Sequence, residues 1–193
     1  MKVKIIEKSR EYDGFFKIDK AVLQHEKFDG EMSKVLTRLD FNRGNTVAVL
    51  LYDADKDSVI LIKQFRYSAY VNDGPGWILE IVAGIIDEGK DTISVAHSEL
   101  MEEAGYEVDD LEFLCKFYVS PGGTSERIDL YLGIAHQKTG DGGGKAEEGE
   151  DIQIIELPLD KAMKMIETGE ICDAKTIIAL QWVKLRKLEG RKS

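Results

Sequence analysis

Cysteine and histidine, which build most zinc sites, are scarce in this chain. The 193 residues include two cysteines, Cys115 and Cys172, which lie far apart and lack metal-binding spacing. This pattern excludes a disulfide framework and is typical of a reducing compartment. The three histidines are scattered, whereas a histidine metal site needs two or three that converge. We therefore expect a cytoplasmic protein whose histidines are ordinary surface or packing residues.

A long apolar run and an excess of basic charge are also absent. No apolar run approaches the length of a membrane span, and the first ten residues are too charged for a signal peptide. The net charge of −10 argues against a nucleic-acid partner, because binding a phosphate backbone needs a basic surface. It leaves room for a small anionic ligand held by a metal ion and one or two arginines. We expect neither a membrane nor a nucleic acid as partner.

The first 42 residues are predicted to form antiparallel β-strands. Apolar and charged residues alternate here, and Asp29-Gly30 is a typical hairpin turn between two such runs. The segment has little core of its own, so we expect it to pack on the main domain or on a second subunit. We therefore divide the chain into an N-terminal β extension, residues 1–42, and a main domain, residues 43–193.

The main domain is predicted to be α+β, because strands dominate and three helices interrupt them. Residues 46–52 are almost wholly apolar, as in a strand buried on both faces. Residues 71–76 are expected to be a loop, residues 137–150 a mobile glycine-rich loop, and Trp77 and Trp182 core anchors. Further strands are predicted at 58–65, 77–82, 111–119, 128–135 and 151–157, and helices at 91–104, 159–168 and 173–188.

The predicted helix at 91–104 carries a group of carboxylates. Glu99 and Glu103 are four residues apart and share one face, with Glu102 beside them. Such a group suits a hard cation such as Mg²⁺, which takes oxygen ligands and substrate phosphates. The alternative is a solvated acidic face. The carboxylates of residues 147–151 could close over this helix and supply a general base that activates water, or could belong to a solvated linker.

The spacing around this helix resembles the Nudix box. In that box a glycine, five residues, a glutamate and seven residues precede Arg-Glu-apolar-any-Glu-Glu-any-Gly-apolar. Here Gly84, five residues, Lys90 and seven residues precede Ser98-Glu99-Leu100-Met101-Glu102-Glu103-Ala104-Gly105-Tyr106. The similarity extends to the branch of the family that hydrolyses ADP-ribose, GDP-mannose and related nucleoside-diphosphate sugars. It rests on Pro121, 15 positions after Tyr106, and on RGNTVAVLLYD, VILIKQFRYSAY, WILEIVAG, SPGGTSER, GEDIQIIELP and DAKTIIALQW.

The resemblance implies a Nudix fold, with a mixed sheet between helices, and a homodimer joined in part by the N-terminal strands. It implies Mg²⁺-dependent hydrolysis, with Mn²⁺ as a possible substitute, of a nucleoside-diphosphate sugar to a nucleoside monophosphate and a sugar phosphate. The implied metal ligands are Ala83, Glu99 and Glu103, assisted by Glu102. The loop position of the general base matches both Glu148 and Glu150, of which we favour Glu150. The implied substrate contacts are Arg38, Arg66, Gly122 and Glu126.

Two positions depart from the box. Lys90 stands in place of the glutamate and Ser98 in place of the arginine, a pair thought to steady the helix in the family. Losing both together leaves no orphan charge from that pair, although Lys90 adds a positive charge near the metal loop. The metal-binding glutamates are intact, so we predict that metal binding is retained. The alternative is a catalytically weakened Nudix-fold protein that binds a nucleotide sugar as a regulator. A nucleoside-triphosphate hydrolase fits less well, because the loop SPGGTSER indicates a diphosphate-sugar pocket. The preferred nucleobase and sugar and the number of metal ions stay open.

Overall fold

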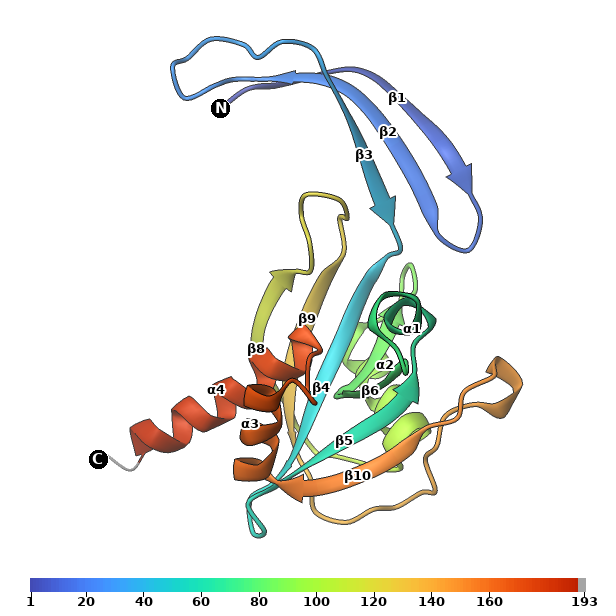
Figure 1. Cartoon of the computed structure of the whole chain (residues 1–193), viewed down its shortest axis with the longest axis vertical. Coiled ribbons are helices and arrows are strands. Elements are labelled where there is room, and N and C mark those ends of the chain that lie inside the picture. Colours follow the sequence, from blue (N-terminus) through green and yellow to red (C-terminus); the bar gives the residue numbers. More distant parts are fainter. Residues whose placement is uncertain (191–193) are drawn as a thin grey trace. The chain divides into compact units, whose positions relative to one another are not determined.

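Three antiparallel strands form the N-terminal part of the chain in the computed structural model, which describes residues 1–190 except the side chains of Asp73 and Glu148. The strands β1 (Val3–Asp13), β2 (Lys17–His25) and β3 (Leu36–Asn42) lie side by side in that order (Figure 1). The turn predicted between two strands is present, with the Gly30 N–H donating to the Lys27 carbonyl at 3.0 Å. Together with Tyr118–Arg127, residues Met1–Asn45 form a compact N-terminal unit.

The N-terminal unit has almost no core, as the sequence predicts. Ser9 is the one residue of β1 that is even half-buried. The exposed apolar side chains of this unit include Val3, Ile5, Phe28, Val35 and Leu39. The strands are therefore held together mainly by their backbone ladder and by charged pairs.

The main unit consists of Thr46–Phe117 and the chain from Ile128 onward, and a mixed sheet forms its centre. The strand order is β10-β5-β4-β9-β8, with β6 paired to β5 and β7 paired to β4. β4 and β9 run parallel, while β5 is antiparallel to β4, β6 and β10. The bounds are β4 Asn45–Asp53, β5 Ser58–Phe65, β6 Trp77–Glu80, β7 Val82–Ile86, β8 Leu111–Tyr118, β9 Arg127–Ile134 and β10 Gln153–Pro158.

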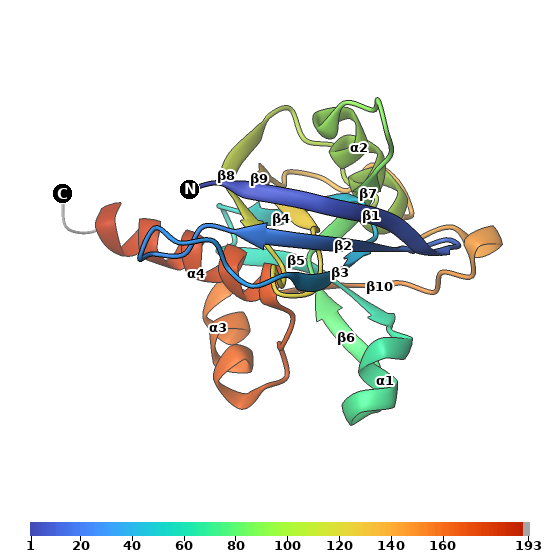
Figure 2. The ribbon, with the colours of Figure 1, turned by 90° about the horizontal axis from the view of Figure 1, so that it is seen from above.

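Helices cover both faces of this sheet. Figure 2 shows α2 (Thr92–Glu99) on one side of the strands and α3 (Leu159–Thr168) on the other, where α4 (Ala174–Gly190) also packs. β4 supplies Leu50 to the α3–α4 side and Leu51 to the α2 side, so it is buried on both faces as predicted. The α+β architecture with a mixed sheet between helices is thus confirmed. Within residues 1–190, no helix is long and apolar enough to cross a membrane.

Four local predictions were wrong. Residues 67–73 form a short helix, α1 (Tyr67–Asp73), so the predicted loop at 71–76 begins inside a helix and the described chain has four α-helices. Seven residues are too few to show helical periodicity. The number of helices predicted for the main domain, three, was therefore also wrong, and the single strand predicted at 77–82 divides into β6 and β7. The helix predicted at 91–104 is confirmed, because α2 and a π-helical turn, Leu100–Ala104, together span residues 92–104. Trp77 is 46% exposed and packs edge-on against Phe65, whereas Trp182 packs against the core.

Candidate active site

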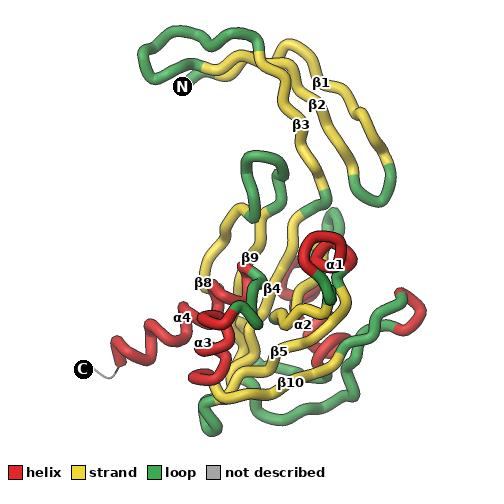
Figure 3. Tube along the Cα trace, viewed as in Figure 1, coloured by secondary structure: helices red, strands yellow, loops and turns green. Residues whose placement is uncertain are grey.

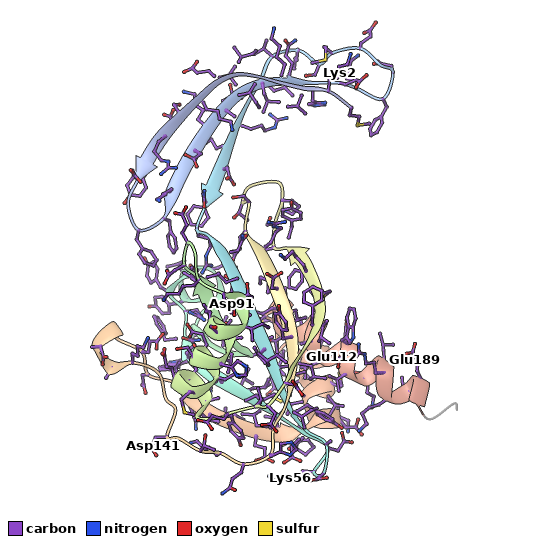
Figure 4. All side chains as sticks on the ribbon, turned by 180° about the vertical axis from the view of Figure 1, so that it is seen from behind. Lys2, Lys56, Asp91, Glu112, Asp141 and Glu189 are labelled. Carbon is purple, nitrogen blue, oxygen red and sulfur yellow. The ribbon has the colours of Figure 1, made fainter. Side chains whose placement is uncertain are left out.

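The acidic helix is defined at both ends by residues that the sequence makes visible. Asp91, labelled in Figure 4, caps its start, because the Asp91 carboxylate accepts a hydrogen bond from the Ser94 N–H at 2.9 Å. At the other end Gly105 has a φ of 71°, which favours glycine. A Cβ on Gly105 would lie 2.3 Å from the Gly140 carbonyl, so glycine also allows the loop to approach closely.

Glu103 is the buried carboxyl of this helix, with 3% of its surface exposed. The Ala83 N–H of β7 donates to Glu103 Oε2 at 3.1 Å. Burial raises the pKa of Glu103 to about 8, and the nearby carboxylates of Glu99 and Glu150 add to the rise against the Ala83 hydrogen bond. The Arg66 cation opposes this rise only in part, so without a metal ion Glu103 favours its protonated form at neutral pH.

Gly84 makes room for the second carboxylate. A Cβ at position 84 would lie 2.2 Å from Glu99 Oε1, so any side chain there would displace the Glu99 carboxylate. The glycine that opens the motif thus lets Glu99 lie directly against β7. Glu99 and Glu103 both reach β7, which agrees with their predicted position on one face of the helix.

A divalent cation fits the chemistry of these donors. Among the described side chains, which exclude those of Asp73 and Glu148, no three of His, Cys, Asp or Glu form a ready-made metal-holding cluster. Burial is the main cause of the raised pKa of Glu103, and the carboxylates of Glu99 and Glu150 add to it electrostatically. Oxygen donors of like charge whose repulsion a cation would relieve suit a hard ion such as Mg²⁺.

Glu102 has a different environment from Glu103. Its Oε2 pairs with Lys145 Nζ at 2.7 Å, and its Oε1 accepts a hydrogen bond from Ser98 Oγ at 2.8 Å. Lys145, followed by Ser98, lowers the pKa of Glu102 despite the opposing effect of partial burial. Lys90, the other changed position of the box, pairs with Asp87 at 2.8 Å on the surface.

The glycine-rich loop joins the end of the acidic helix through its backbone. Figure 3 shows this long loop, interrupted by a short 3₁₀ turn, Ala146–Glu148. The N–H groups of Gly143 and Gly144 donate to the Glu103 and Glu102 carbonyls at 2.9 and 3.0 Å. The Lys145 N–H donates to Glu150 Oε2 at 2.8 Å. Glu150 thus acts electrostatically on Glu103, whereas the side chain of Glu148 lies outside the described part of the chain.

Arg66 follows β5 and is anchored by a buried partner. Its Nε and Nη2 donate to Glu80 at 2.7 and 3.1 Å, and Lys175 of α4 donates to Glu80 Oε2 at 2.5 Å. Burial tends to raise the pKa of Glu80, but Lys175 and Arg66 together hold it below its usual value. Arg66 also acts electrostatically on Glu103, so the cation belongs to the same neighbourhood as the carboxylates.

Sequence reasoning missed three of these residues. Glu80 could have been noticed, because it is a charge inside the otherwise apolar run WILEIV. Lys175 lies 95 positions from Glu80, and Lys145 lies in a polar loop, so neither gives a local signal.

The remaining candidates belong to the N-terminal unit. Arg38 is exposed on β3 and lines a hollow of about 540 Å³ with residues of β1 and β2. Glu126 is buried, and its Oε2 lies 3.7 Å from Arg43 Nε. Gly122 is exposed in the loop that hydrogen-bonds to Phe41 of β3. The structure thus places Arg38, Gly122 and Glu126 in one unit, and the candidate metal ligands and Arg66 in the other.

Comparisons with known proteins give a consistent result. A family model described as the NUDIX domain matches residues 42–180. The ADP-ribose pyrophosphatase of Escherichia coli K12 is 40% identical over 184 residues, which is 95% of this chain and 88% of that protein. The GDP-mannose pyrophosphatase of Shigella flexneri serotype 5b is 36% identical over 179 residues, 91% and 92% of the two chains. A crystal structure of an ADP compounds hydrolase has the same fold, with a TM-score of 0.74 at 24% identity over 99% and 96% of the chains.

Proposed function

Because the chain belongs to the Nudix family of hydrolases, we propose that it cleaves the pyrophosphate linkage of a nucleoside-diphosphate sugar with the help of Mg²⁺. The observation that carries this proposal is the placement of two carboxylates against β7: Glu103 is buried and accepts the Ala83 N–H, and Glu99 lies against Gly84. Carboxylates in such a group repel each other unless a cation or a proton intervenes. A site that binds a metal ion and an anionic substrate accounts for this arrangement.

The chain's own donors would hold the metal ion. Ala83, Glu99 and Glu103 are the proposed ligands, with Glu102 assisting. When bound, a divalent cation supplies charge neutralisation for the phosphates and lowers the pKa of a bound water. Mg²⁺ is the proposed ion because the donors are hard oxygens, and Mn²⁺ should substitute.

In the proposed reaction, a water oxygen forms a bond to one phosphorus and the bond from that phosphorus to the bridging oxygen breaks. Glu150 accepts the proton of the attacking water, and the products are a nucleoside monophosphate and a sugar phosphate. The Lys145 N–H orients Glu150 for this role. The Arg66 guanidinium, which is fixed by two hydrogen bonds to Glu80, offsets the charge that develops on the phosphates. Arg38, Gly122 and Glu126 remain proposed substrate contacts.

ADP-ribose and GDP-mannose are the proposed substrates, because the curated relatives bear those names. The test is a panel of nucleoside-diphosphate sugars incubated with the full chain and Mg²⁺ or Mn²⁺, and the readout is the inorganic phosphate that an added phosphatase frees from the monoester products. We expect one of the two substrates to give the highest turnover. An absence of turnover across the whole panel would refute the proposal.

A binding or regulatory protein is the second candidate, and Lys90 and Ser98 are the observations that favour it. Glu99→Gln separates the two functions. Under the catalytic proposal it abolishes turnover, while Glu107→Gln, an exposed carboxylate just beyond the helix, leaves turnover unchanged. If the protein only binds its ligand, the wild-type chain shows no turnover. In that case Glu99→Gln and Glu107→Gln both keep the thermal stabilisation that the ligand induces.

We also propose a homodimer in the cytoplasm. The exposed apolar side chains of the N-terminal unit, such as Val3, Phe28 and Leu39, support a partner surface on its strands. The free thiols of Cys115 and Cys172 are consistent with a reducing compartment. Light scattering at micromolar concentration tests the dimer, and a monomeric mass would contradict it.

A further inference from the structure

The changed positions of the box leave the acidic helix without its expected internal ion pair. Lys90 pairs with Asp87, and both side chains are more than 60% exposed. Ser98 bonds to Glu102 at 2.8 Å but brings no charge. Lys90 still acts electrostatically on Glu99 and Glu102, but direct contact with Glu102 is made by Lys145 of the glycine-rich loop, whose Nζ lies 2.7 Å from Glu102 Oε2.

Lys145 contacts two carboxylates from opposite ends of the residue. Its ammonium group pairs with Glu102 of the helix, while its backbone N–H donates to Glu150 Oε2 at 2.8 Å. The Glu150 N–H in turn donates to the Lys145 carbonyl at 3.2 Å. We infer that Lys145 is a positioning residue, which replaces the missing ion pair of the box and holds the proposed base Glu150 at the end of the metal-binding helix. This inference rests on the proposed function.

The surrounding loop shows why the side-chain contact matters. The N–H groups of Gly143 and Gly144 already donate to the last turn of the helix, so the loop approaches it before Lys145. Glycine has high conformational freedom, and backbone bonds alone order such a segment poorly. The ion pair of Lys145, the residue after Gly144, fixes the loop to the helix by a side-chain contact. This contact orients the turn that leads to Glu150.

Lys138 provides a matched comparison within the loop. Its Nζ donates to the Asp141 carbonyl at 2.6 Å, a contact inside the loop itself. Both lysines carry the same charge, although Lys138 is exposed and Lys145 is half-buried. They differ in that only Lys145, among the two, bonds to the acidic helix. Replacing either lysine changes the net charge by the same amount, but only the Lys145 substitution removes a contact with the acidic helix. A difference between the two variants therefore reports on that contact and not on net charge.

The consequences of losing the Lys145 charge follow from its contacts, which are with Glu102 and Glu150. Lys145→Met keeps a long unbranched side chain but cannot pair with Glu102. The loop then opens more often, and Glu150 spends less time in place. We expect kcat to fall roughly 10- to 100-fold, as when a group that orients a metal ligand or its neighbour is removed. KM should change less than about twofold, because Lys145 does not hold substrate.

The experiment compares the full-length chain with Lys145→Met, Lys145→Arg and Lys138→Met. Turnover of ADP-ribose and GDP-mannose is measured with Mg²⁺, and amide hydrogen exchange is measured without metal or substrate. We expect faster exchange at Gly143 and Gly144 in Lys145→Met, and values close to wild type in Lys138→Met. Lys145→Arg should restore both kcat and exchange protection, because it returns the charge.

A double variant tests the route through Glu102. In a Glu102→Gln background, Lys145→Met should have little further effect on kcat or exchange, since its partner is gone. Equal effects in the two backgrounds would overturn the inference, as would an unchanged kcat or unchanged exchange in Lys145→Met. If the wild-type chain showed no turnover, the proposed function would fail, whereas the exchange comparison would still decide whether Lys145 holds the loop.

Discussion

Substituting Glu103 by glutamine should remove a pH-dependent loss of stability from the metal-free protein. The pKa of Glu103 is about 8 in the folded chain, compared with 4.5 for an ordinary glutamate. Between these two values the folded state holds a proton that the unfolded state has lost. The free energy of unfolding therefore decreases as pH rises through this window. Each pKa unit corresponds to about 1.36 kcal/mol, so the loss reaches at most about 5 kcal/mol above pH 8.

Glu103→Gln removes the ionisable group but keeps an oxygen that can accept the Ala83 N–H. The variant should therefore lack this pH-dependent loss and, in the presence of a chelator, should be more stable than wild type at pH 8. Added Mg²⁺ should restore the stability of the wild-type chain, because the ion neutralises Glu103, and should have a much smaller effect on the variant.

Urea unfolding at pH 5, 6, 7 and 8, with a chelator and then with Mg²⁺, measures both effects. Glu107→Gln is the control, because that side chain is exposed. The reasoning would be refuted if the difference in unfolding free energy between wild type and Glu103→Gln were the same at all four pH values.

Three other substitutions have defined outcomes. Gly84→Ala should displace the Glu99 carboxylate and abolish Mg²⁺-induced thermal stabilisation, while circular dichroism shows an intact fold; retained stabilisation would contradict this. Arg66→Lys loses bidentate contact with Glu80 and should raise KM roughly tenfold, so an unchanged KM would argue against phosphate contact. Thr176→Val leaves a buried backbone N–H without its acceptor and should cost about 1–3 kcal/mol by urea unfolding, and a neutral result would show that another acceptor replaces it.

The pH dependence of metal binding connects these predictions to the site. A cation must displace the proton of Glu103 at neutral pH, so the apparent affinity for Mg²⁺ should rise between pH 6 and about pH 8. Calorimetry in buffers of different ionisation enthalpy would detect the released proton. An affinity independent of pH would place the metal ion away from Glu103.

Local rules were enough to predict much of the fold. The helix α3 has the predicted bounds, and β4 is buried on both faces because six consecutive residues have side chains that avoid water. The cap at Asp91 and the stop at Gly105 follow from hydrogen bonds and backbone angles within a few residues. In contrast, α1 was missed because its seven residues contain no full pattern of helical repeats.

In the candidate site, too, the features that depend on neighbouring residues were predicted and those that depend on tertiary packing were not. The spacing of Glu99 and Glu103 determined that both would share a helix face, because the helical repeat depends only on neighbouring residues. Only the tertiary structure decided that Glu103 is buried and has a pKa near 8, whereas Glu102 pairs with Lys145. Burial and pairing depend on segments that are distant in sequence, and their packing carries no signal in the residues of the helix itself.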